Sequence, residues 1–112
     1  MKTFQLLEQL EYRDAAPYAQ PLLVNEEGRV LRFTLRPGQM VREHEAPHSP
    51  VYLVVLQGSG LFAGPDGQEE RFGPNTLLVF DSGERHSLRA DSEDVVCMVI
   101  LHEAPLTHKQ AE

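Results

Sequence analysis

The fold of this chain is decided by the stretch Gly38-Gln-Met-Val-Arg-Glu-His-Glu-Ala-Pro-His-Ser-Pro-Val-Tyr-Leu-Val-Val-Leu-Gln-Gly-Ser-Gly60. A glycine opens it, an extended segment with two histidines follows, and an apolar run leads to a glycine-flanked turn. A shorter stretch has a similar layout: Asn75-Thr-Leu-Leu-Val-Phe-Asp-Ser-Gly-Glu-Arg-His86. We therefore expect apolar strands joined by tight turns, with the histidines beside them.

The rest of the chain continues this pattern of short strands. Residues 29–36 alternate, with Arg32 and Thr34 on one side and Leu31 and Phe33 on the other. Such alternation is typical of a half-buried strand. Turn residues recur every six to twelve positions, which favours an all-β barrel or sandwich. The predicted strands cover residues 21–25, 29–36, 40–45, 51–56, 61–63, 69–72, 76–80, 85–90 and 95–101.

Three runs are apolar at every position, namely Val51–Leu56, Leu77–Phe80 and Val95–Leu101. A strand that is apolar on both sides is covered on both sides. One side would face the interior and the other a second sheet or a second subunit, so we expect a homodimer. Cys97 lies in the last run and is expected to be a small core residue rather than a reactive thiol.

The length of 112 residues suits one domain. We divide it into an N-terminal helix and lead-in (1–19), a β-barrel (20–104) and a polar tail (105–112). The helix is expected within residues 3–11, where Phe4, Leu7 and Glu11 share one side and Leu6 and Leu10 lie close by, after the potential cap Thr3.

Composition narrows the classes of partner. Seventeen acidic residues against ten basic ones give a net charge of -7, which disfavours nucleic acid and anionic membranes. No apolar run approaches the length of a membrane span. A single cysteine excludes an intrachain disulfide, so a reducing cytoplasm is the expected location.

The two histidine-bearing stretches resemble the paired motifs of the cupin superfamily, G-x5-H-x-H-x(3,4)-E-x6-G and G-x5-P-x-G-x2-H-x3-N. Gly38, His44 and Gly58 match the first motif, and Gly83 and His86 match the second. The resemblance implies a single-domain cupin: a double-stranded β-helix, which is a jelly-roll-like conical barrel of two antiparallel sheets.

The departures from the motifs fall mainly on metal ligands. In cupins, two histidines and a glutamate of the first motif join the histidine of the second around Mn, Fe, Ni, Zn or Cu. Here the second histidine is replaced by Ala46 and the glutamate by Val51, which leaves His44 and His86. The remaining departures are Asn75, Asp81 and Ala90, in place of glycine, proline and asparagine.

His48 could complete a rearranged metal site of His44, His48 and His86. In a straight strand, four residues at roughly 3.3 Å each separate His44 from His48 by about 13 Å. Histidines on one zinc ion lie closer, since Zn–N bonds measure about 2.0–2.1 Å. Pro47 and Pro50 would have to bend the chain between them. Such a site would suit a metal-dependent oxygenase or isomerase.

The leading interpretation is instead a small-molecule-binding cupin with a degenerate or absent metal centre. Its small organic ligand would lie in the barrel lumen, near His44, His86 and Arg42. A third alternative is a module that only dimerises. Glu69 and Glu70 are expected to be solvated turn acids, and no role is assigned to His102 or His108.

Overall fold

The structure is a computed structural model that describes residues 1–44 and 48–102, apart from the side chains of Glu43 and His44. This part of the chain contains strands and turns and no helix, which confirms the all-β prediction. The strands are β1 (Tyr18–Asn25), β2 (Gly28–Leu35), β3 (Met40–His44), β4 (Val51–Gln57), β5 (Gly60–Ala63), β6 (Glu69–Phe72), β7 (Thr76–Phe80), β8 (His86–Ala90) and β9 (Val95–Leu101).

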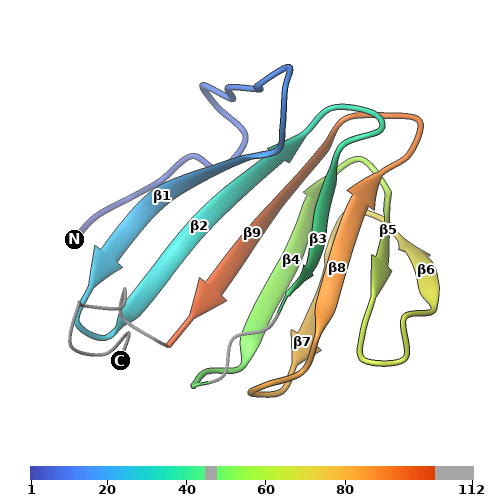
Figure 1. Ribbon diagram of the computed structural model, residues 1–112. Coiled ribbons are helices and arrows are strands. Elements are labelled where there is room, and N and C mark those ends of the chain that lie inside the picture. Colours follow the sequence, from blue (N-terminus) through green and yellow to red (C-terminus); the bar gives the residue numbers. More distant parts are fainter. Residues whose placement is uncertain (45–47, 103–112) are drawn as a thin grey trace.

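The strands form two antiparallel sheets (Figure 1). The larger sheet has the order β1-β2-β9-β4-β7, and the smaller one has the order β3-β8-β5-β6. Strands that are distant in sequence are neighbours in both sheets. In the larger sheet β9 lies between β2 and β4, and in the smaller one β8 lies between β3 and β5. Such long-range pairing is typical of a jelly-roll-like barrel.

The core lies between the sheets and is formed mainly by the inward-facing residues of the strands from β2 to β9. Leu53 and Val55 of β4 are almost fully buried, as is Leu88 of β8 in the other sheet. Among the described residues, the opposite side of the apolar strands is covered only in part. Val96 of β9 is fully buried there, whereas Leu77 and Val79 of β7 are 58% and 51% exposed. The expected cover on both sides is therefore complete on the inner side and partial on the outer side.

The turns adopt the backbone conformations that the motif residues predict. Gly58 has a φ of 74°, and a Cβ added there would collide with the Asp94 carbonyl oxygen. Glycine therefore meets both a conformational and a steric requirement at this position. Asn75 has a φ of 66°, and its N–H donates to the Val55 carbonyl at 2.8 Å. Asparagine tolerates this left-handed conformation better than most residues.

The predicted N-terminal helix is wrong. Residues 1–17 form turns and irregular backbone, and Gln9 has a φ of 55°, which is incompatible with a right-handed helix. The reason is a tertiary contact. The Arg32 guanidinium is buried on the outer side of β2 and donates to the carbonyl oxygens of Leu6 and Glu8 at 3.0 and 3.2 Å. These hydrogen bonds hold the segment against β2 in an irregular conformation.

Strand β1 begins at Tyr18, inside the predicted lead-in of residues 1–19, and the last described strand ends at Leu101. The division into lead-in, barrel and tail stays a prediction. The predicted tail, 105–112, lies outside the described residues. Over the part of the chain that is described, no helix is long and apolar enough to cross a membrane.

Candidate functional site

His86 is a buried polar residue at the start of β8, with an exposed fraction of 4%. Its Nδ1 lies 3.2 Å from the carbonyl oxygen of Glu84. Because a carbonyl oxygen only accepts hydrogen bonds, Nδ1 is the donor in this contact. The local turn thus orients the imidazole.

The ring of Phe80 covers one face of this imidazole. The two ring centroids are 4.6 Å apart and the planes differ by 19°, which is a stacked arrangement. Phe80 is buried at the end of β7, in the sheet opposite β8. The His86–Phe80 pair therefore connects the two sheets across the barrel interior.

The structure brings His44 and His86 together at the level of the backbone. They are Cα partners in the β3–β8 pair, while the side chain of His44 lies outside the described part of the chain. A register shift separates this pair from the pairing of Val41 with Leu88. The regular pairing of β3 with β8 is therefore interrupted around Arg42. Arg42 is exposed, and its role as a ligand contact stays a prediction.

The residues at the cupin ligand positions do not fit a four-ligand metal centre. Val51 is buried on the inner side of β4 and has no donor atom, and Ala46 has none either. His48 is exposed in the turn that precedes Pro50. Among the described side chains, no three His, Cys, Asp or Glu residues form a group that could hold a metal ion. Whether His44, His48 and His86 meet stays a prediction, because it depends on the His44 side chain.

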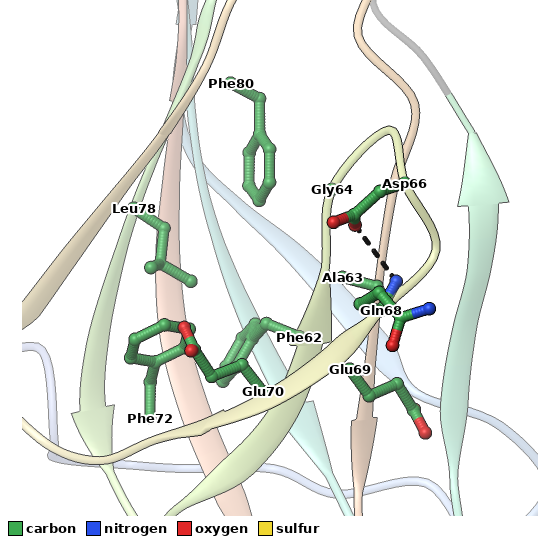
Figure 2. Close-up of a pocket in the computed structure, with 10 residues that line it drawn as sticks. All are labelled: Phe62, Ala63, Gly64, Asp66, Gln68, Glu69, Glu70, Phe72, Leu78 and Phe80. Atoms are coloured by element: carbon green, nitrogen blue, oxygen red, sulfur yellow. Dashed lines mark hydrogen bonds between the residues drawn. The ribbon is translucent and has the colours of Figure 1, made fainter.

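A pocket of about 270 Å³ opens beside the His86–Phe80 pair, between the β5–β6 hairpin and β7 (Figure 2). Phe80 belongs to both features, because it stacks on His86 and lines the pocket. The apolar wall of the pocket consists of Phe62, Phe72, Leu78 and Phe80. The remaining lining residues are Ala63, Gly64, Asp66, Gln68, Glu69 and Glu70.

The three carboxylates of the pocket have different surroundings. Glu69 accepts from Arg89 Nε and Nη2 at 2.6 and 3.1 Å, and these hydrogen bonds lower the pKa of its carboxyl. Asp66 accepts the backbone N–H of Gln68 at 3.0 Å within the hairpin turn. Glu70 lies directly opposite the buried Phe62 in the β5–β6 pair. Its carboxylate therefore projects from the inner side of the small sheet.

Sequence reasoning missed this pocket. Glu69 and Glu70 are exposed, as expected of solvated acids, but they belong to the predicted strand of residues 69–72 and not to a turn. A signal was present, since Glu70 and Phe72 share one side of a strand by parity. The parity alone did not show which side faces the interior. The side that faces the interior is identified by the pairing of Glu70 with the buried Phe62.

Two antiparallel sheets with this strand order, enclosing a core and a histidine-bearing interior, define a cupin-type double-stranded β-helix. A family profile described as a cupin domain matches residues 31–102. The chain therefore belongs to the cupin family.

Solved structures agree on the fold. A Klebsiella pneumoniae protein with a double-stranded β-helix domain has a TM-score of 0.86 at 16% identity, over 96% of this chain and 94% of that chain. An RmlC-like cupin from Desulfovibrio desulfuricans has a TM-score of 0.83 at 24% identity, over 91% and 96%. A predicted oxalate decarboxylase from Thermotoga maritima has a TM-score of 0.70 at 21% identity, over 84% and 99%. No curated protein matches the sequence.

Proposed function

We propose that this cupin binds a small organic molecule in the pocket between the β5–β6 hairpin and β7. The observation that carries the proposal is the composition of the pocket, an apolar wall of three phenylalanines and a leucine beside a few polar groups. Small-molecule sites combine these features, the apolar wall providing affinity and the polar groups orientation. The stacked His86–Phe80 pair gives the inner end of the pocket a fixed shape.

Gly64 offers a direct test, because a side chain there would occupy the pocket. An added Cβ would lie 3.9 Å from Phe80 Cε1, an ordinary contact distance, and the backbone of Gly64 is not left-handed. We therefore expect Gly64→Leu to fold and to block the pocket. Ligand-observed NMR with a panel of small carboxylates, sugars and amines should show binding to the wild type that is lost in this variant.

Gly73 provides the matched control. Its added Cβ would lie 3.9 Å from Ser59 Cβ, its backbone is also not left-handed, and it does not line the pocket. Binding should persist in Gly73→Leu. Equal binding to all three proteins, or none to the wild type, would refute the pocket as the ligand site.

The competing function is a metal-dependent oxygenase or isomerase that uses His44, His48 and His86. One observation favours it, namely the direct Cα pairing of His44 with His86. Elemental analysis of the same purified proteins distinguishes the two functions. Stoichiometric transition metal that disappears in His86→Ala would support the metal enzyme, whereas its absence after loading with Mn, Fe, Ni, Zn or Cu would exclude that site.

The partner and the location are further parts of the proposal. A homodimer is supported by the exposed apolar side chains on the outer side of β7. A reducing cytoplasmic location is supported by the single cysteine, which is buried and unpaired.

A further inference from the structure

The pocket holds one carboxylate that faces its aromatic wall. Glu70 pairs with Phe62 across the β5–β6 ladder, and Phe72 follows two residues later on the same side of β6. The rings of Phe62 and Phe72 are 6.1 Å apart. In Figure 2 the Glu70 side chain extends from β6 toward the side of the strand where the Phe72 ring lies. An accessible carboxylate therefore stands beside two aromatic rings.

No described residue provides a counterion for this carboxylate. Within the described part of the chain, Glu70 forms neither an ion pair nor a hydrogen bond. The neighbouring cations point to the other side of β6, where Arg89 is engaged by Glu69 and Arg71 by Asp91. Among the described residues that line the pocket, three are acidic and none is lysine, arginine or histidine.

From this arrangement we infer that the pocket selects organic cations, that is, small ammonium compounds with an apolar body. The inference rests on the proposed function, because it names the ligand class of the same pocket. An ammonium group beside Glu70 gains an ion pair and can lie against the faces of the phenylalanine rings. An anionic ligand would be repelled by Glu70 and Asp66, and the chain's net charge of -7 adds to the repulsion. The volume of about 270 Å³ restricts the ligand to a small molecule.

Three probes of nearly equal shape isolate the effect of charge. Choline carries a quaternary ammonium, 3,3-dimethylbutan-1-ol is its uncharged carbon analogue, and 3,3-dimethylbutanoate carries a negative charge. Isothermal titration calorimetry on the full chain should show choline binding about tenfold more tightly than the alcohol, as an ion pair and a cation–π contact together predict. The anion should bind more weakly than the alcohol.

Variants of the pocket assign this preference to residues. Glu70→Gln keeps the shape of the side chain and should weaken choline binding about three- to tenfold while leaving the alcohol unchanged. Phe72→Leu should also weaken choline more than the alcohol, because it removes an aromatic face. The matched control is Glu26→Gln, the same change of charge in the exposed β1–β2 turn, which should leave both affinities unchanged.

The outcomes separate this inference from the proposed function. If the three probes bind equally and Gly64→Leu abolishes all binding, the pocket is a ligand site but the cation preference is refuted. If choline binding survives Gly64→Leu, or is unaffected by Glu70→Gln, the ammonium does not bind in this pocket and the inference fails. If no probe binds the wild type, the inference also fails, while the broader panel still tests the proposed function.

Discussion

Cys97 shows how the packing of the barrel controls the chemistry of a single side chain. It is fully buried on β9, opposite Phe33 of β2 and Val55 of β4. Burial raises the pKa of its thiol from 9.0 to about 12, because the thiolate would lose its hydration. At neutral pH the thiol is therefore protonated and enclosed, which confirms its interpretation as a core residue and makes it a poor nucleophile.

The raised pKa predicts how stability depends on pH. The folded state holds the Cys97 proton up to about pH 12, whereas the unfolded chain releases it near pH 9.0. Between these values the unfolded state binds fewer protons, so the free energy of unfolding should fall by about 1.4 kcal/mol per pH unit from this group. Urea denaturation from pH 8 to 11 measures the slope. In Cys97→Ala this contribution should vanish, and equal slopes for both proteins would contradict the assignment.

At the scale of an element, Arg32 holds the N-terminal segment on the outer side of β2. Besides the carbonyls of Leu6 and Glu8, its guanidinium donates to Gln20 Oε1 at 2.6 Å. The Thr34 hydroxyl donates to the Glu11 carbonyl at 2.6 Å. Two polar residues on one side of a strand thus hold a segment that has no regular secondary structure of its own.

Removal of Arg32 should therefore release this segment. Arg32→Ala removes the shared donor of several partly buried carbonyls, and we expect a loss of roughly 2–4 kcal/mol in the free energy of unfolding. Hydrogen exchange should quicken in residues 5–11 more than in β4 or β9. Arg71→Ala, which removes a surface ion pair with Asp91, should cost less than about 1 kcal/mol. Equal losses in the two variants would contradict an anchoring role for Arg32.

The same residues show how far the sequence could predict the fold. The strands were predictable because alternation and turn residues are local signals, and each predicted strand overlaps an observed one. The N-terminal helix was mispredicted because the helical spacing of apolar residues such as Phe4 and Leu7 is a local signal, which does not report contacts with distant residues. The contact that overrides it comes from Arg32, more than twenty residues away.

Prediction of the site was limited in the same way, because local sequence signals do not report contacts between distant residues. His86 was identified from its motif, and its burial supports an interior position. The pocket was not identified, because it combines β5, β6 and β7, whose relative positions depend on the register between strands. The register shift in β3 between Val41 and His44 also has no local signal in the sequence.

At the scale of the whole molecule, the outer side of the large sheet is covered only in part. The N-terminal segment contacts β2, while β4, β7 and β9 expose an apolar surface beside it. Strand pairing arranges the side chains of this surface in two rows. One row contains Leu77, Val54 and Met98 and continues to Arg32, which the N-terminal segment engages; the other contains Val79, Tyr52, Ile100, Val30 and Leu23. Apart from Arg32, neither row contains a charged residue. A two-fold axis would bring the same rows of two copies together, as in sheets that pack face to face.

The exposed positions on β7 test whether this surface is the dimer interface. Sedimentation analysis of the wild type should give about twice the chain mass of 12.6 kDa. Leu77→Lys combined with Val79→Lys places two charges at the edge of the surface, and this variant should sediment as a monomer because burying unpaired lysines is unfavourable. Val24→Lys is the control. Val24 is similarly exposed, but it pairs with Arg29 and lies on the other side of the sheet from Leu77 and Val79. That variant should remain dimeric. A monomeric wild type, or a double variant that keeps its dimeric mass, would refute this interface.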